Sequence, residues 1–314
     1  MTGPNEATTG SAAQDIDVLT LVLPLRAKDG LSLPDFYDYW LNAHVTLPAR
    51  FPGISSVWLH AVSFEAQTWP RTAGVSSRPA PEDEFHGVPE AAFATADGLA
   101  AFQEASGLQM DDGINFLAEQ IAYASLEENT RTEVDRTDEP APDGHDTWVR
   151  HLLFLRRRPE VTVQELRRFV VEELTTALAA SPEVLKVRRH LFEPIEVTLD
   201  HPGVGMWKPE DRQYQAAVEV VVADAASLVR LAASQAWTGV EESVADHCEA
   251  VHAARVTRCI TTKHQGHITL AGVRGVAAAD VIDRLGADNQ RQPAMSALFL
   301  PAGLLRLPGS APPL

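Results

Sequence analysis

The chain has 314 residues, and 45% of them are hydrophobic, which is enough to bury a core and excludes wholesale disorder. Its 43 acidic residues outnumber the 26 Lys and Arg, and the net charge of −17 disfavours nucleic acid and anionic membrane surfaces as partners. Cys248 and Cys259 are the only cysteines, so a disulfide framework and a cysteine-rich zinc site are excluded.

Residues 1–16 are small, polar and acidic, and they lack the basic and apolar regions of a signal peptide. We therefore expect a disordered N-terminus. No window approaches the unbroken apolar length that a membrane helix needs. We expect a cytoplasmic protein, in which the reducing environment leaves both cysteines without a partner.

Residues 17–126 show strand alternation and helical periodicity that predict one unit of β-α-β-β-α-β order. Its expected strands are 18–25, 54–64, 84–93 and 119–126, and its expected helices are 33–44 and 96–106. A stretch rich in Pro and Ser, 67–81, predicts a long loop. Residues 127–146 are strongly acidic and lack apolar periodicity, which predicts a linker between two domains.

Residues 147–262 predict a second unit with the same order of elements. Its expected strands are 147–155, 184–197, 214–222 and 249–261, and its expected helices are 163–180 and 225–235. Residues 200–212 predict another long loop. Residues 263–314 predict a C-terminal extension with a strand at 267–273, a helix at 277–287 ending at Gly286, and a strand or hairpin at 296–307.

An internal repeat relates the two units. Residues 21–44 align without a gap on residues 151–174, and residues 90–102 align on residues 219–231. Two matches at nearly the same offset indicate a duplicated unit. The order of elements predicts an α+β fold of two tandem ferredoxin-like repeats, each with both helices on one sheet face. The uncovered sheet faces are expected to pair, so that one chain forms a dimeric α/β barrel by itself.

The first helix of the first unit carries a polar and aromatic pattern. Phe36 and Tyr39 precede Trp40 and His44 in a W-x-x-x-H spacing, and a Pro-Gly-Ile entry to the next strand follows at 52–54. Together with residues 83–102, this segment resembles the EthD domain of the dimeric α/β-barrel superfamily.

The resemblance is weaker in the second unit, where Val170 and Leu174 stand in place of the tryptophan and the histidine. The second repeat is therefore expected to be degenerate. The resemblance implies a pocket between sheet and helices. Members and near relatives of the family include accessory proteins of ether degradation, polyketide dehydratases and cyclases, muconolactone isomerases, cofactor-free monooxygenases and haem enzymes.

His44 is the sharpest catalytic candidate, because Trp40 and Tyr37 precede it by one and two helical turns on the same face. An imidazole beside aromatic rings suits general acid–base catalysis. The alternative is a histidine that caps its own helix end, where the helix dipole favours its charged form.

Further candidates lie on the expected strands. Strand alternation places His60 and Trp58 on one face, which lines the pocket if that face is turned toward the barrel. His86 opens the next strand as a possible catalytic residue, and Tyr123 in the last strand is a phenolic donor or an ordinary core tyrosine. The complete set of predicted site residues is catalytic His44, Tyr37, His60 and His86, with Trp40, Trp58, Tyr123 and Phe36 binding substrate.

Other histidines are assigned less specific roles. His190 follows Arg188 and Arg189, a cluster that binds a substrate carboxylate or, more commonly, offsets local acids. His247, His252, His264 and His267 fit no established metal-binding spacing with the cysteines, so no metal site is predicted. No cofactor is predicted either, and haem enters only through the resemblance.

These observations predict a cofactor-independent lyase or isomerase, of dehydratase or cyclase type, in bacterial secondary metabolism or aromatic degradation. It would move protons on a small, apolar, aromatic or polyketide-like molecule through His44, assisted by Tyr37 or Tyr123. Two alternatives stay open: a non-catalytic accessory protein of an oxygenase system, and a cofactor-free or haem-dependent oxygenase. The chain is expected to act as a monomer with an internal pseudo-dimer or as a homodimer, with no nucleic-acid or membrane partner.

Overall fold

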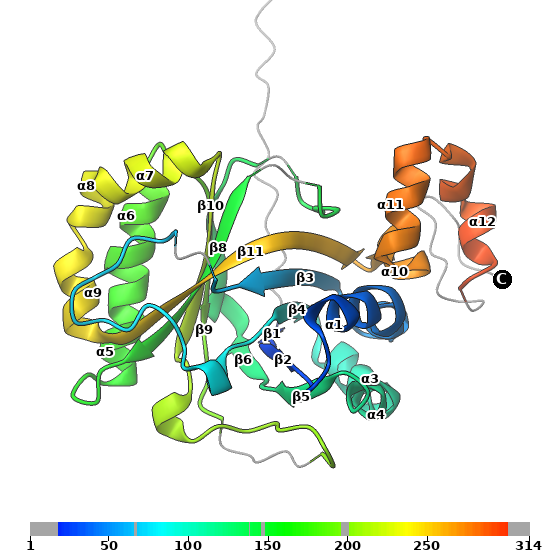
Figure 1. Cartoon of the computed structure of the whole chain (residues 1–314), viewed down its shortest axis with the longest axis horizontal. Helices are drawn as coiled ribbons and strands as arrows, with labels where there is room; N and C mark the ends of the chain where they lie inside the picture. The colour runs from blue at the N-terminus through cyan, green and yellow to red at the C-terminus, as the bar shows by residue number, and fades with distance from the viewer. Residues whose placement is uncertain (1–17, 66–67, 138, 146–147, 196–200, 301–314) are drawn as a thin grey trace, which may run out of the picture.

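The computed structural model describes residues 18–65, 68–137, 139–145, 148–195 and 201–300 (Figure 1). The predicted N-terminal segment 1–16 lies outside this range. In the first repeat the strands are β1 (Leu19–Val22), β2 (Leu25–Ala27), β3 (Ser56–Ser63), β4 (Gly87–Phe93), β5 (Leu117–Gln120) and β6 (Tyr123–Leu126). The helices are α1 (Leu33–Tyr39), α2 (Thr46–Arg50), α3 (Ala96–Ala105) and α4 (Gly107–Gly113). Pro24, which has no backbone N–H to donate, lies between β1 and β2, where one expected strand is interrupted.

The second repeat has the same order of elements. Its strands are β8 (Val149–Arg157), β9 (Val184–Leu191), β10 (Ala216–Val222) and β11 (Cys248–His264). Its helices are α5 (Val163–Arg168), α6 (Thr175–Ala180), α7 (Ala225–Ala233), α8 (Gln235–Thr238) and α9 (Glu241–His247). In each repeat the strands pair in the order fourth, first, third, second, all antiparallel, which is the ferredoxin-like arrangement.

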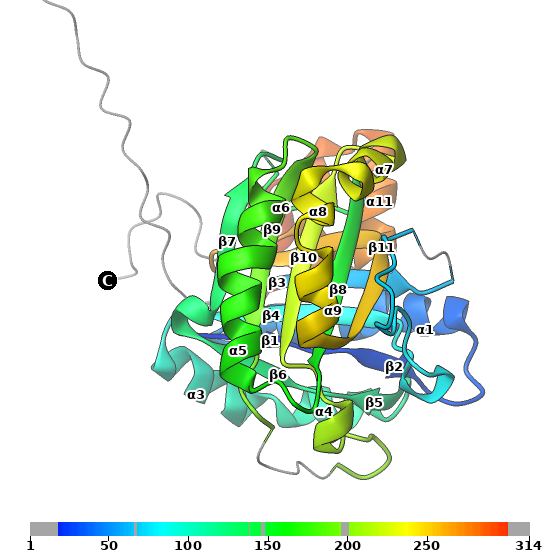
Figure 2. The ribbon, with the colours of Figure 1, turned by 90° about the vertical axis from the view of Figure 1, so that its left-hand side faces the viewer.

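The two sheets join at both of their edges. Strand β11 has 17 residues, and its first half pairs with β8 while its second half pairs with β3. On the opposite side, the N–H of Glu193, just after β9, donates to the carbonyl of Ala124 in β6 at 2.8 Å. Helices lie outside the sheets (Figures 1 and 2). The predicted α+β fold, two ferredoxin-like repeats that pair as a barrel within one chain, is confirmed.

The inner faces of the two sheets bury their own apolar cluster. It is separate from the two cores under the helices and includes Phe85, Tyr123, Phe154, Phe192 and Tyr214. Because alternate strand residues point to opposite faces, each strand supplies one set of side chains to a helix-covered core and another set to the barrel interior. The barrel interior is thus built equally from both repeats.

Local structure repeats as well. In both repeats the first helix widens into a π-helical turn at the same place, at Trp40–His44 and at Phe169–Leu174. Thr162 and Glu165 form a complete capping box before α5, whereas Asp35, one methylene shorter than Glu165, reaches only the hydroxyl of Ser32. These shared details agree with a duplicated unit.

The acidic segment predicted as a linker, 127–146, contains strand β7 (Thr130–Asp135), which pairs with β9. Sequence periodicity did not indicate this strand, because its residues are polar and partly exposed and show no apolar alternation. Pairing with the edge of a sheet needs free backbone groups and not an apolar face.

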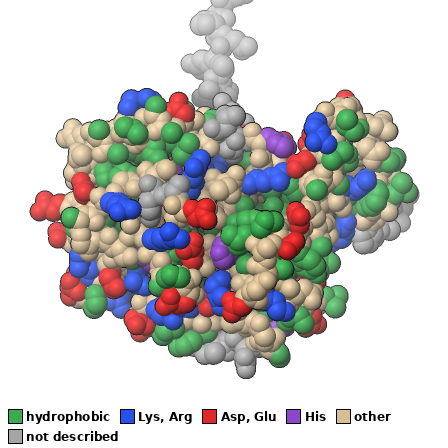
Figure 3. Space-filling view, viewed as in Figure 1, with side chains coloured by type: hydrophobic (Ala, Val, Ile, Leu, Met, Phe, Trp, Pro, Cys, Tyr) green, Lys and Arg blue, Asp and Glu red, His purple; other side chains and the backbone are tan. Residues whose placement is uncertain are grey.

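Acidic and basic side chains are interspersed over the face of the molecule seen in Figure 3.

The C-terminal extension packs on the first repeat through helices. Its elements are β12 (His267–Ile268), α10 (Leu270–Arg274), α11 (Val276–Leu285) and α12 (Pro293–Ala297). The strand expected at 267–273 ends at Ile268 and is followed by α10, because the side chain of Thr269 accepts from the N–H of Gly272 and caps that helix. Helix α11 ends as expected at Gly286, which is in the left-handed conformation. The hairpin expected at 296–307 does not form at 296–300, where α12 ends and a turn follows, and residues 301–307 lie outside the described range.

Gly53, at the entry to β3, is a position where we expect any side chain to be costly. Its φ is +80°, and a Cβ there would lie 1.8 Å from the carbonyl oxygen of Gly98. We expect Gly53→Ala to lower the free energy of unfolding by about 3 kcal/mol or more in urea titrations. Gly30→Ala is the matched control, because Gly30 has φ +83° with nothing within 4 Å. Equal losses in the two variants would contradict the role of the close approach.

Candidate active site

A cavity of about 610 Å³ opens at one end of the barrel. Two long connections build its mouth, β3–β4 from the first repeat and β9–β10 from the second. Each crosses to the other repeat: Ser76 forms a parallel bridge with Ala250, and Gly205 forms one with Glu119. The loops expected from the sequence at 67–81 and 200–212 thus cover a cavity.

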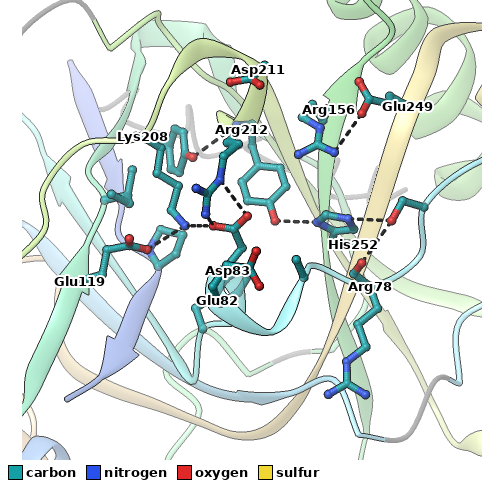
Figure 4. A pocket seen from close by; sticks show the side chains of 17 residues that line it. Arg78, Glu82, Asp83, Glu119, Arg156, Lys208, Asp211, Arg212, Glu249 and His252 are labelled. Carbon is teal, nitrogen blue, oxygen red and sulfur yellow. Dashed lines mark hydrogen bonds and ion pairs between the residues drawn. The ribbon is translucent and has the colours of Figure 1, made fainter. Parts of the chain in front are cut away.

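A cluster of ion pairs holds the two connections together (Figure 4). The carboxylate of Asp83 accepts from Lys208 Nζ at 2.5 Å and from the guanidinium of Arg212. Lys208 also contacts Glu119 at 2.8 Å. Burial alone would raise the pKa of Asp83, but Arg212 and Lys208 outweigh it and lower that pKa. Asp83 therefore stays ionised and pins both connections over the cavity.

A hydrogen-bonded chain of three side chains lies on the opposite wall. The Ser76 hydroxyl donates to the carbonyl of Arg78 at 3.1 Å, so its oxygen accepts from Nε2 of His252 at 3.2 Å. Nδ1 of His252 is then left to accept from the hydroxyl of Tyr214 at 2.7 Å. Burial, and then the charge of Arg156, lower the pKa of His252 to about 3. His252 is therefore a neutral imidazole with a proton-accepting nitrogen bound to a phenol.

Tyr123 places a second phenol in the same cavity. Its hydroxyl oxygen accepts from the backbone N–H of Tyr214 at 3.3 Å, and the two rings are 6.0 Å apart. Burial raises the pKa of Tyr123, so its proton stays on. Within the described part of the chain that proton has no acceptor, which leaves it available to an oxygen atom of a ligand.

The sequence of the first repeat matches a known family. The model of the EthD domain matches residues 28–120, from the end of β2 to the end of β5. The match covers less than a third of the chain. No curated protein matches the chain.

Several solved structures are similar to the chain at low sequence identity. Two are named "Putative monooxygenase". The one from Fusobacterium nucleatum subsp. nucleatum ATCC 25586 has a TM-score of 0.48 and 9% identity, and covers 78% of this chain and 95% of its own. The one from Lactobacillus acidophilus NCFM has a TM-score of 0.42 and 11% identity, with 78% and 96% covered. An anthrone oxidase-like protein has a TM-score of 0.45 and 10% identity, with 77% and 92% covered.

The predicted residues of the first helix pack in the core between the helices and the sheet, and none of them lines this cavity. Nδ1 of His44 lies 2.8 Å from Asp112, and the ring packs on Phe116. Burial lowers the pKa of His44, although Asp112 opposes the shift. The partner of this ring is thus a carboxylate of another helix and not its own helix end. Trp40 and Phe36 are fully buried in the same core.

Tyr37 and His86 bind backbone atoms. The Tyr37 hydroxyl lies within hydrogen-bond distance of the carbonyls of Val62 and His86, at 3.1 and 3.0 Å. Nδ1 of His86 accepts from the N–H of Ala27 at 3.1 Å. Both side chains therefore connect α1, β2, β3 and the residue before β4, outside the cavity at the barrel mouth.

His60 and Trp58 line a second cavity, of about 130 Å³, whose wall contains none of the residues that line the first. His60 faces the barrel interior, where its Nε2 lies 3.9 Å from Glu219. In the basic cluster of Arg188, Arg189 and His190, the imidazole of His190 lies 3.7 Å from Glu90, and Arg188 binds the same carboxylate at 2.6 Å. The basic cluster at 188–190 thus offsets buried acids. Tyr123 is the one predicted site residue on the wall of the large cavity.

His252 and Tyr214 were not assigned to a site by sequence reasoning, although the repeat points to them. The offset that aligns residue 90 with residue 219 also aligns Tyr123 with His252 and Phe85 with Tyr214. All four side chains line the large cavity, so equivalent positions of the two repeats meet there. Extending the alignment into the flanking strands would have paired the predicted Tyr123 with His252.

His252 offers no axial ligand to a haem iron, because both of its ring nitrogens are hydrogen-bonded, to Tyr214 and to Ser76. In the described ranges, no three His, Cys, Asp or Glu side chains are grouped to hold a metal ion. No helix of the described residues has the length and apolarity to cross a membrane.

Proposed function

We propose that the chain is a cofactor-independent enzyme of the lyase or isomerase type, which moves a proton on a small aromatic or polyketide-like molecule. The observation that carries this proposal is the presence, in one cavity, of a neutral His252 bonded to Tyr214 and of Tyr123 with a free phenolic proton. The first pair accepts a proton and the second phenol donates a hydrogen bond, which are the two roles that enolisation beside a carbonyl requires.

Tyr123 binds the carbonyl oxygen of the substrate in this scheme. Tyr214 takes the proton from the carbon next to the carbonyl and passes its own proton to Nδ1 of His252, so that an enolate and an imidazolium form together. In an isomerase the proton returns to another carbon. In a dehydratase it joins a departing β-hydroxyl group to form water.

The charge of Arg156 couples these steps. In the free protein this cation helps to keep His252 neutral. Negative charge that develops on the substrate oxygen offsets the cation, so His252 becomes a better proton acceptor as the enolate forms. The proton transfer is therefore favoured only when substrate occupies the cavity.

The cavity also supports a substrate class. Phe85, Tyr123 and Tyr214 offer aromatic faces within about 610 Å³, which accommodates one or more fused rings. Ion-paired Asp83, Lys208 and their neighbours line the other wall, which favours a molecule with several oxygen atoms over a wholly apolar one. All of these groups come from one chain, so the cavity needs no second subunit.

The test is exchange of substrate protons for deuterium, followed by NMR in D₂O with a panel of aromatic ketones and polyphenolic β-hydroxy ketones. We expect exchange by the purified protein without added cofactor, and a loss of about 100-fold in Tyr123→Phe, as for an oxyanion donor. Tyr39→Phe is the matched control, because Tyr39 donates to Asp112 away from both cavities. The proposal fails if Tyr123→Phe retains full exchange, or if conversion requires oxygen in a parallel anaerobic assay.

A further inference from the structure

Of the Nε and Nη2 donors of the Arg156 guanidinium, only Nη2 has a hydrogen-bond partner among the described residues. Arg156 lies on the inner face of β8, and its Nη2 donates to Oε1 of Glu249 at 3.1 Å. Its Nε is buried and has no hydrogen-bond partner among the described residues. The N–H groups of Nε and Nη2 point in the same direction, and together they match the two oxygens of one carboxylate. We call these two donors, Nε and Nη2, the Arg156 fork, and at present a single oxygen of Glu249 is bonded to it.

Glu249 is the more mobile partner of this pair by its position. Its side chain is 44% exposed, against 18% for Arg156. The carboxylate of Glu249 can rotate toward solvent, where water solvates its charge, whereas the less exposed Arg156 stays against the barrel wall. The nearby acids Asp83 and Glu119 are already paired with Lys208 and Arg212. No other acid of the cavity wall is bonded to Arg156 in the described residues.

We propose that the substrate is a carboxylic acid, and that its carboxylate replaces Glu249 on the Nε and Nη2 groups of Arg156. This inference rests on the proposed function of the cavity and names its substrate class: a small aromatic acid that also carries the carbonyl held by Tyr123. Both donors of the fork are then satisfied, and Glu249 is released to solvent. Glu249 is thus an intramolecular competitor of the substrate carboxylate, and it keeps Arg156 ion-paired while the cavity is empty.

Binding without turnover tests this inference separately from the reaction. 2-Naphthoate and 2-naphthamide have the same ring and differ in charge, and their affinities are measured by calorimetry. We expect the wild type to bind the acid about tenfold or more tightly than the amide, since a charge-assisted bidentate pair replaces a neutral contact. Arg156→Gln should remove this preference and leave the amide affinity within about twofold.

Glu249→Gln gives a prediction of opposite sign that does not depend on the folding of the arginine variant. Loss of the competing carboxylate should tighten binding of 2-naphthoate by about 3- to 10-fold. Glu82→Gln is the matched control, because Glu82 lines the same cavity, carries the same charge and has no bond to Arg156. It should change the affinity by less than about twofold.

Each outcome decides the inference. Equal affinities for acid and amide in the wild type, equal effects of Glu249→Gln and Glu82→Gln, or no binding of either probe would overturn it. Proton exchange that is abolished in Tyr123→Phe would then still support the proposed function. Conversely, the wild type could bind 2-naphthoate more tightly than 2-naphthamide while Tyr123→Phe retains full proton exchange. That result would support the carboxylate site at Arg156 and contradict the proposed chemistry.

Discussion

A His252→Gln variant is expected to lose roughly 100- to 10,000-fold in kcat, the range of a general acid–base group. Glutamine keeps a donor toward Ser76 but offers no nitrogen that accepts a proton from Tyr214. The measurement is the rate of deuterium exchange or of product formation under saturating substrate. Near-UV circular dichroism and thermal unfolding accompany it, to show that the variant is folded.

The same substitution at His44 separates the two histidines. His44→Gln breaks the contact with Asp112 at 2.8 Å, so we expect a modest loss of stability, about 1 kcal/mol. We expect little change in kcat, because His44 does not line the cavity at the barrel mouth. The opposite result, loss of turnover at His44 and not at His252, would assign the chemistry to the first helix.

Stability should fall steeply below pH 6.5. Burial is the main cause that lowers the pKa of three histidines, to about 4 for His151 and His190 and to about 3 for His252. The unfolded chain binds protons at these positions near the ordinary value of 6.5, and the folded chain does not. Each histidine therefore costs up to about 1.4 kcal/mol per pH unit as the pH falls, or roughly 5 kcal/mol for all three by pH 5.

His60 gives the opposite slope on the alkaline side. Burial works against its charged form, but Cys259, Glu219 and Glu90 outweigh it and raise the pKa of His60 to about 9. The stability that it contributes is complete below pH 6.5 and is lost as the pH rises toward 9. Three histidines gain stability and one loses it as the pH rises through 6.5, so we expect urea unfolding between pH 5 and 9 to show a maximum near pH 7. In His151→Gln the acidic slope should become shallower, and an unchanged slope would exclude His151 as a contributor.

The repeat made most of the fold predictable. The matched segments at 21–44 and 151–174 share apolar alternation, a hydroxyl cap and a helical period, and these local patterns determine strand and helix. Four strands and two helices in that order have one common arrangement, and its uncovered face must be buried. The strand β7 escaped prediction, because an edge strand that pairs through its backbone needs no apolar pattern.

The candidate site was much less predictable. The W-x-x-x-H pattern drew attention to His44, whose side chain the structure holds against Asp112 and Phe116. The polar groups of the large cavity come from strands far apart in the sequence, and His252 resembles any other histidine until its neighbours are known. Tyr123 was found from its type, but its free proton follows only from the contact with Tyr214.

Periodicity, caps and internal similarity act over short distances along the chain, and they were enough to predict that a doubled ferredoxin-like unit closes on itself. Which inward side chains meet depends on the folded chain, because two crossing connections bring Ser76, His252 and Tyr214 to one wall and are held there by Asp83. Hydrogen bonds and burial act through space and set the charge of each group. The proton-accepting state of His252 therefore belongs to the folded molecule and not to its sequence pattern.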